Sequence, residues 1–188
     1  MPGVLGPEVP RAACPEDCST ADRASTDLMS AAPDLPRSNV TVRAAGASGD
    51  LDGHFSVRHE VFVREQRLFE VNDLDDRDDD PTTVHLVGDA GGRIVGAVRI
   101  YPLDGAGIWQ GDRLSVLREH RASHVGVDLV QLAVRTAAAR GGTAMEAHIQ
   151  MANVRFFEFL GWQVHGPAEI YVGTPHQPML IDLTTLYE

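Results

Sequence analysis

The sequence predicts an α/β fold: a mixed, mostly antiparallel central sheet with helices on both faces. The main observation is the order of the elements. A strand and a helix precede three strands, and a helix, a strand, a helix and a closing hairpin follow. The pair Gly91-Gly92 supplies the positive φ angles of a tight turn between two apolar segments. No internal repeat is visible, and 188 residues are enough for one domain of ordinary size plus a tail.

The predicted domain covers residues 39–188 and follows an N-terminal tail, residues 1–38, which we expect to be disordered. The tail holds six of the 11 prolines and has no periodic apolar pattern. It therefore cannot bury enough apolar surface to offset the entropy of ordering the chain. The first strand is predicted in the segment SNVTVRAA, where Val40 and Val42 alternate with polar residues.

A single helix, broken at most once, is predicted for residues 51–69 because apolar side chains recur at helical spacing. Its apolar face consists of Leu51, Phe55, Phe62 and Phe69, with Arg58 as the polar exception. Residues 70–80 follow, with seven carboxylates against one arginine, and end at Pro81. We expect this acidic segment to be a solvated loop, and as an alternative a loop whose field attracts a cationic acceptor.

The remaining elements follow from alternating or helical apolar patterns. Strands are predicted in the segments VHLV (84–87), RIVGAVRIYPL (93–103), 108–117, TAMEAHIQ (143–150), WQVHG (162–166), EIYVG (169–173) and PMLIDLTTL (178–186). A long amphipathic helix after residue 126 has an apolar face of Val127, Val130, Val134 and Ala137 or Ala138 and ends at Gly141-Gly142. A short helix is predicted in MANVRFFEFLG (151–161) and ends at Gly161.

Composition narrows the class of partner. A formal net charge of -11 argues against nucleic acid or an anionic membrane as a partner and suits a cationic one. No apolar run approaches the roughly 20 residues that a membrane helix needs, and the N-terminus lacks the pattern of a secretory signal. We expect a cytoplasmic protein with no membrane association, and we leave a homodimer open.

The two cysteines, Cys14 and Cys18, lie in the proline-rich tail with no histidine nearby. A structural zinc site would need two further ligands from distant parts of the chain. We therefore expect no metal site.

The segment DRLSVLREHRASHVGVDLV places an apolar strand, a basic turn and the start of the long helix in succession. The first amides of a helix lack intrahelical partners, and the helix dipole is positive at that end. Arg118 and Arg121 add charge just upstream. The segment therefore predicts an anion site suited to a phosphate or pyrophosphate.

This strand, the turn from Arg121 to Gly126, the following helix and NVRFFEFLGW together resemble the GNAT superfamily of acyltransferases over residues 40–184. The segments VRHEVFVREQRLF, IQMANVRFFEFLGW and YVGTPHQPM are similar to two branches, the ElaA-like acetyltransferases and the N-acetyltransferases associated with nitrogen starvation. The second branch resembles the sequence more closely. The resemblance implies an acetyl-CoA-dependent N-acetyltransferase that acts on the amine of a small molecule.

The resemblance also implies a donor site. Its cofactor-binding residues would be Leu114, Ser115, Val116, Arg121, His124, Val125, Gly126, Val127, Asn153 and Phe157. The strand residues would offer backbone groups to the pantetheine amides, and the turn would hold the pyrophosphate. His124 stands where the family has a glycine, which would strain the backbone if φ were positive there. Asn153 would bind the pantetheine arm, cap its helix, or do both.

Amine acylation requires a base, because an amine of pKa near 10 is protonated at neutral pH. Glu65 and His148 are the candidates. Glu65 ends the first helix near the expected cleft, and its alternative role is an ion pair with Arg58 or Arg64. His148 alternates with Glu146 on the strand after the donor helix and could instead be a structural core histidine. His176 is a further residue that either positions substrate or caps a turn.

The family often uses a tyrosine to protonate the leaving thiolate, and Phe157 occupies the matching position. Tyr101 or Tyr171 could replace it. The predicted domain contains no cysteine, so we expect direct transfer rather than an acyl-cysteine intermediate.

Two alternatives stay open. RHEVFVREQ, DLDDRDDD and VGAVRIYP also resemble the first half of acyl-homoserine lactone synthases, although NVRFFEFLGW does not fit their second half. A degenerate, non-catalytic GNAT-like sensor that binds coenzyme A is the other, because His124 and Phe157 replace a glycine and an acid.

Overall fold

The computed structural model describes residues 40–103 and 107–187. The predicted tail, residues 1–38, lies outside the described residues, so the proposed boundary at residue 39 stays a prediction. The strands are β1 (Val40–Ala44), β2 (Val84–Ala90), β3 (Ile94–Pro102), β4 (Ile108–Val116), β5 (Ala144–Gln150), β6 (Gln163–Val164), β7 (Glu169–Tyr171) and β8 (Thr174–Asp182). The helices are α1 (Asp50–Arg58), the π-helix η1 (His59–Glu65), α2 (Val125–Ala139) and α3 (Val154–Phe159), with 3₁₀ turns η2 (Arg118–His120), η3 (Met151–Asn153) and η4 (Thr184–Tyr187).

The described strands form one sheet of order β1-β2-β3-β4-β5-β8-β6, and β7 also pairs with β8. All neighbouring strands are antiparallel except β4 and β5, which run parallel because α2 returns the chain to the other end of the sheet. Gly91 and Gly92 have φ angles of 67° and 95° in the tight turn between β2 and β3. The predicted mixed, mostly antiparallel sheet is confirmed.

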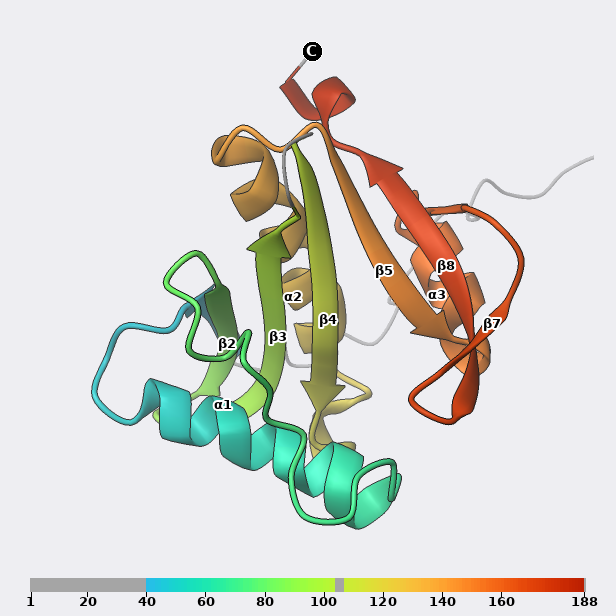
Figure 1. The fold of residues 1–188 in the computed structure, drawn as a ribbon. Helices are drawn as coiled ribbons and strands as arrows, with labels where there is room; N and C mark the ends of the chain where they lie inside the picture. Colours follow the sequence, from blue (N-terminus) through green and yellow to red (C-terminus); the bar gives the residue numbers. More distant parts are fainter. Residues whose placement is uncertain (1–39, 104–106, 188) are drawn as a thin grey trace, which may run out of the picture. The chain divides into compact units, whose positions relative to one another are not determined.

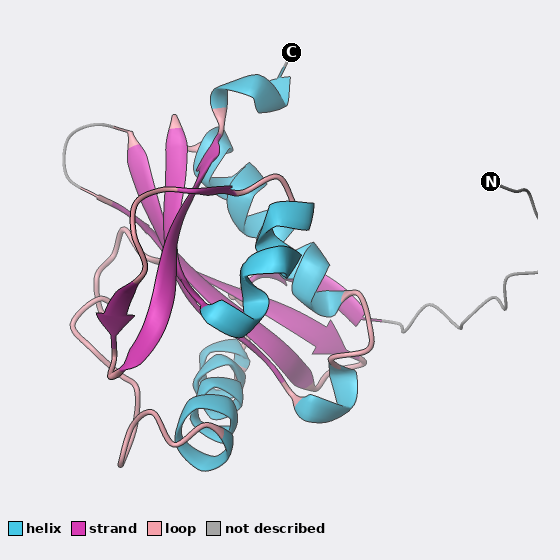
Figure 2. Cartoon of the chain, turned by 90° about the vertical axis from the view of Figure 1, so that its right-hand side faces the viewer, coloured by secondary structure: helices cyan, strands magenta, loops and turns pink. Residues whose placement is uncertain are grey.

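Helices cover both faces of the sheet, as predicted (Figures 1 and 2). On one face, α1 packs its Val57 against Val95 and Ala97 of β3. On the other, α2 and α3 pack against residues of β3 with opposite orientation, Val98 and Ile100. Successive residues of β3 therefore serve two different cores, as the period of two in a strand requires. We refer to the two faces as the α1 side and the α2 side.

The first helix is confirmed, but its predicted inner face is only partly correct: Phe62 and the polar exception Arg58 are buried, whereas Phe55 is half-buried. Leu51 is 47% exposed, and Phe69 lies beyond the last helical residue. The buried positions are Asp50, His54, Val57, Arg58, Val61 and Phe62. Three of these are polar and each has a partner, so a pattern of apolar residues alone could not identify the face. The helix also widens to π geometry at His59, which changes its register.

The long helix α2 and the C-terminal strands mostly match the prediction. Val130, Val134, Ala137 and Ala138 are buried, but Val127 is only half-buried, and Val125, Leu129 and Ala133 complete the inner face. Gly141 ends the helix with a φ of 85°. The last strand, β8, begins at Thr174, earlier than predicted, and the chain continues as a 3₁₀ turn rather than a strand after Asp182.

Candidate active site

The two parallel strands β4 and β5 pair along only part of their length. Their register runs from Ile108 opposite Ala144 to Gln110 opposite Glu146 and then stops. Beyond this point the two strands separate, as Figure 1 shows. A pocket of about 890 Å³, its open mouth included, lies in the gap and is lined by Gly111 to Leu114 on β4 and by Ala147 to Gln150 on β5.

A β-bulge shapes the β4 wall. Ala97 and Arg99 of β3 pair with Ser115 and Asp112, so β4 holds one extra residue between them. The extra residue is Arg113, a non-glycine residue with a φ of 54°. Because of the bulge, Asp112 and Arg113 both direct their charged groups to ion pairs on the α1 side. Leu114 packs against the apolar core on the α2 side.

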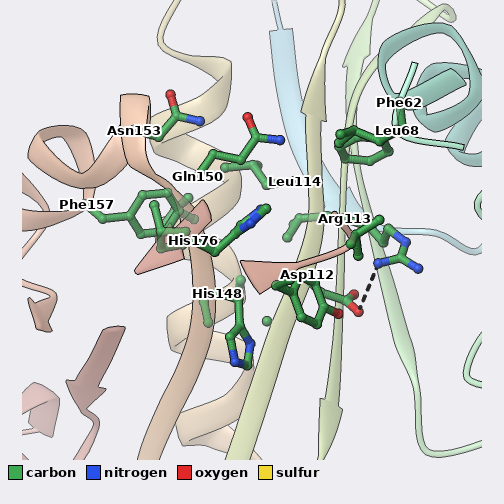
Figure 3. Close-up of a pocket in the computed structure, with 18 of the residues that line it drawn as sticks. Phe62, Leu68, Asp112, Arg113, Leu114, His148, Gln150, Asn153, Phe157 and His176 are labelled. Carbon is green, nitrogen blue, oxygen red and sulfur yellow. Dashed lines mark ion pairs between the residues drawn. The ribbon is translucent and has the colours of Figure 1, made fainter. Parts of the chain in front are cut away.

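The pocket passes through the sheet, and the chemical character of its lining differs between the α1 side and the α2 side. Along β5, Met145, Ala147 and Ile149 are buried in the core of the α2 side, and the residues between them are half-buried. His148 and Gln150 therefore face the α1 side, together with His176, which pairs directly opposite Gln150 on β8. Figure 3 places His148, His176, Asp112 and Gln150 around the opening. Polar groups thus gather on the α1 side and apolar groups on the α2 side.

A buried network of charges supports the β4 wall. We call it the arginine–aspartate network; its members are Arg58, Arg99, Arg113, Asp73, Asp75, Asp78 and Asp112. Arg58 Nε lies 2.8 Å from Asp73 Oδ2, and the two side chains are 0% and 2% exposed. Arg99 reaches Asp112 Oδ2 at 2.7 Å and Asp78 Oδ1 at 2.9 Å.

This network corrects the prediction for the acidic loop. Asp73 and Asp78 are not solvated, because they hold the buried guanidinium groups of Arg58 and Arg99. Burial by itself would raise the pKa of Asp78, but hydrogen bonds and charge from Arg58 outweigh it and hold that pKa below its usual range. The loop thus fastens α1 to β3 and β4. Arg58 on an otherwise apolar helix face, followed by a run of aspartates, was the available sequence signal.

The predicted pyrophosphate turn lies between β4 and α2. His124 has a φ of -78°, so the strain that a positive φ would cause does not arise. It makes no side-chain capping bond at the start of α2. A Cβ on Gly126 would meet only Val116 Cγ2, at 3.8 Å. The protein itself therefore does not need a glycine there. The Val125 side chain is buried in the core, so only its backbone could reach a ligand.

Glu65 joins this turn and does not line the pocket. Its carboxylate accepts hydrogen bonds from Arg121 at 2.7 and 2.5 Å and from Arg118 at 3.1 Å. The hydrogen bond from Arg121 is the main reason that the pKa of Glu65 is lowered. Arg121 also donates its Nε–H to the carbonyl of Val116. A carboxylate held in this way is a weak base.

His148 lies in the pocket between two neighbours from the C-terminal hairpin. Its Nε2 is 2.8 Å from Glu169 Oε1, and its ring stacks on Tyr171 with a centroid distance of 4.7 Å. The contact with Glu169 was not predicted from the sequence. Glu169 belongs to β7, which is only three residues long, and nothing in the pattern of β7 places Glu169 beside His148 of β5.

His176 and Asn153 line the same pocket. The Nδ1–H of His176 donates to the carbonyl of Thr174 at 2.9 Å, and the ring is buried. Asn153 occupies the N-cap position of α3, yet its side chain makes no capping hydrogen bond. Figure 3 shows its amide beside Gln150. Asn153 therefore lines the pocket without capping its helix.

The aromatic residues considered for the acid position differ in whether they line the pocket. Phe157 is buried in the pocket wall and packs edge-on against Trp162, with ring centroids 5.3 Å apart. Tyr171 lines the pocket, whereas Tyr101 does not. Burial raises the pKa of Tyr101 to about 12. Of the predicted residues, the pocket therefore brings together His148, His176, Leu114, Asn153, Phe157 and Tyr171.

Within the described ranges, no group of three or more His, Cys, Asp or Glu side chains is placed to hold a metal ion. Among the same residues, no helix is long and apolar enough to cross a membrane.

Comparisons with known proteins agree with this geometry. An uncharacterized N-acetyltransferase of Bacillus subtilis, YjcF, is 32% identical over 129 residues, which cover 68% of this chain and 89% of that protein. The crystal structure of Escherichia coli ElaA matches with a TM-score of 0.67 at 20% identity, covering 75% of this chain and 98% of that one. A CoA-dependent acyl-homoserine lactone synthase, BjaI, matches with a TM-score of 0.61 at 23% identity, covering 72% and 76%.

The model of the acetyltransferase (GNAT) family matches residues 53–162, which contain the gap between β4 and β5, the turn and α3. With the relative in Bacillus subtilis, this match shows that the chain belongs to the acetyltransferase (GNAT) family and is an acyltransferase of that type.

Proposed function

We propose that the protein transfers an acetyl group from acetyl-CoA directly to the amine of a small molecule. One observation carries the proposal: the gap between β4 and β5 opens beside the N-terminus of α2. An extended pantetheine arm needs the free edge of a strand, and a pyrophosphate needs unpaired amides. The gap offers the first along Leu114, Ser115 and Val116, although the Val116 carbonyl already accepts from Arg121. The first turn of α2 offers the second at Gly126 and Val127, because the Val125 amide donates to Ser123 Oγ at 3.5 Å.

Arg121 and His124 would add positive charge and ring N–H groups at the pyrophosphate. Glu65 already pairs with Arg121, so we assign it to positioning this arginine rather than to proton transfer. Asn153 would hydrogen-bond the pantetheine arm, and the Phe157 ring would form an apolar wall beside it.

We assign the base to His148. A carboxylate such as Glu169 beside Nε2 favours the tautomer that carries its proton there, which leaves Nδ1 free to accept a proton. The amine would lose its proton to His148 and attack the thioester carbonyl. His176, with its Nδ1–H held by Thr174, would hold the acceptor through Nε2.

Tyr171 is our candidate for the acid that protonates the leaving thiolate, because it lines the pocket and stacks on His148. The only cysteines of the sequence, Cys14 and Cys18, belong to the predicted tail, which supports direct transfer. A cytoplasmic location and a role in nitrogen metabolism belong to this proposal on the sequence resemblance. A homodimer is compatible with it.

An amine-library assay tests the proposal, with thiol release from acetyl-CoA as the readout. At least one small amine should be acylated by the wild type, and His148→Ala should lower kcat by about 10²- to 10⁴-fold. Glu65→Gln should instead change the KM for acetyl-CoA and leave kcat nearly constant. Absence of acetyl-CoA binding at millimolar ligand would overturn the proposal. A larger kcat loss in Glu65→Gln than in His148→Ala would reverse the assignment of the base.

One alternative is favoured by a specific observation. The acyl-homoserine lactone synthase BjaI shares the fold, and five of the seven members of the arginine–aspartate network, all but Asp112 and Arg113, lie in the segments that resemble those enzymes. A direct screen for acyl-homoserine lactone product separates the two functions. A non-catalytic sensor would bind acetyl-CoA and release no thiol with any amine.

A further inference from the structure

We propose that the α2 side of the pocket is an acyl-chain chamber, so that the protein takes donors with a saturated acyl chain of medium length as well as acetyl-CoA. This inference rests on the proposed function, since it places the donor thioester in the gap between β4 and β5. It extends the range of donors and leaves the transfer chemistry as proposed.

The lining of the pocket on the α2 side is apolar and comes from three elements. It includes Val130 and Ala133 of α2, Met145 and Ala147 of β5, Phe157 of α3 and the following Trp162. All six side chains are buried members of the main core cluster. The pocket therefore continues beyond the plane of the sheet to the helix that covers it. An acetyl group adds a single methyl beyond the carbonyl and would leave most of this apolar surface without a partner.

Small residues leave space on the α2 side of the pocket. Ala133 and Ala147 present only methyl groups to the chamber. Gly111 lies where β4 leaves β5 and makes room for the Met145 side chain, since a Cβ there would meet the Met145 methyl at 2.9 Å. Close-packed interiors rarely leave space of this kind, because each void loses the contacts of the atoms around it. A volume bordered by two alanines suits an apolar occupant.

The direction of the chain follows from the charges. His148, His176, Asp112 and Arg113 all lie on the α1 side of the pocket. A protonated amine would approach from that side, toward the base. The thioester carbonyl would then lie in the gap, with the acyl chain pointing away from the charged groups and into the chamber.

Calorimetric binding to the full-length protein tests this inference without knowledge of the acceptor. The titrants are coenzyme A, acetyl-CoA, butyryl-CoA, hexanoyl-CoA and octanoyl-CoA. Each methylene that enters the chamber should tighten binding by about fourfold, until the chamber is full and affinity levels off or falls. A flat or falling affinity from acetyl-CoA onward, with coenzyme A still bound, overturns the chamber and leaves the proposed function intact. If no titrant binds, the proposed function itself fails.

Variants on α2 locate the effect. Ala133→Leu should fill the chamber and remove the gain from longer chains, while coenzyme A, which carries no acyl group, still binds. Ala139→Leu is the matched control, because residue 139 is an exposed position of the same helix, and it should keep the wild-type series. Val130→Ala should move the preferred chain to a longer one, and this keeps the test decisive if Ala133→Leu does not fold. An unchanged series in both Ala133→Leu and Val130→Ala would contradict the assignment.

Discussion

The two sides of the sheet are attached to their helices by different forces. On the α1 side, Arg58 and Arg99 are almost fully buried and are held by aspartates of a loop. On the α2 side, α2 and α3 pack through aliphatic and aromatic residues such as Leu129 and Phe157. The candidate active site lies where these two regions meet. Its polar mouth belongs to the first region and its apolar interior to the second.

This difference determines how each side responds to substitution. A buried ion pair is costly to break, because the remaining charge stays buried without a partner. Apolar packing loses stability in proportion to the volume removed and tolerates swaps of similar size. We therefore expect the loss of a single charge on the α1 side to lower stability sharply. Substitutions on the α2 side should lower stability in proportion to the volume that they remove.

The largest effect is expected for Arg58→Met. Asp73 and Asp78 would lose their buried guanidinium partner, and the free energy of unfolding should fall by about 3–5 kcal/mol. Urea unfolding measures it. Arg64→Met is the matched control on the same helical segment, since Arg64 is exposed and, among the residues that the structure describes, forms an ion pair only with Glu60, at 3.4 Å. It should change stability by no more than about 0.5 kcal/mol. Equal losses in the two variants would show that the network adds no special stability.

A smaller effect is expected from acid, through His54 on the inner face of α1. Burial lowers the pKa of His54 to about 3. Between pH 6.5 and 3 the unfolded chain therefore binds this proton and the folded protein does not, so stability falls as pH falls. From pH 7 to 4.5 the loss should be about 2 kcal/mol. The carboxylates of lowered pKa begin to contribute below about pH 5, and His85, whose pKa is also lowered by burial, contributes in the same direction as His54. Urea unfolding of His54→Leu should depend less on pH over this range, and an unchanged slope would rule out His54 as the source.

The apolar side should tolerate a swap of similar volume. Met179 is 1% exposed and lies in the core cluster of the α2 side. Met179→Leu should cost less than about 1.5 kcal/mol, measured by the same urea unfolding. A loss as large as that of Arg58→Met would remove the contrast between the two sides.

The smallest effect on stability, with a clear effect on binding, is expected for Gly126→Ala. A Cβ there meets only Val116 at ordinary contact distance, and alanine is the better helix former by about 1 kcal/mol. Stability should stay constant or rise, while coenzyme A affinity should fall about tenfold because the Cβ points into the proposed pyrophosphate site. Gly46→Ala is the control, since its Cβ would meet nothing within 4 Å. Unchanged affinity in Gly126→Ala would place the pyrophosphate elsewhere.

Local patterns predicted much of this fold and less of the site. Alternation along β2, β3 and β5 and the Gly91-Gly92 turn are local signals, and they gave the order and type of the elements correctly. The inner face of α1 was predicted only in part because Asp50, His54 and Arg58 are buried with partners that lie far away in the sequence. Burial of a charge depends on its partner, and a pattern along one helix does not contain that partner.

The same limit holds for the candidate active site, where contacts between separate elements could not be predicted from local patterns. Leu114, Asn153 and His148 line the pocket, as the motif and the strand alternation predicted. The contacts of Glu65 with Arg118 and Arg121, and of His148 with Glu169, join residues from separate elements. The β4 wall of the pocket is shaped by the bulge at Arg113, and no local signal marks that residue as the extra one.

The most direct test of the central claim is a crystal structure of the protein with acetyl-CoA. We predict that the thioester lies in the gap between β4 and β5, with the pyrophosphate on the amides of Gly126 and Val127. The acetyl methyl should point toward Ala133 and Met145, and His148 should lie on the opposite side of the carbonyl. Acetyl-CoA bound outside the gap, or with its acetyl group among the charges of the α1 side, would contradict the account.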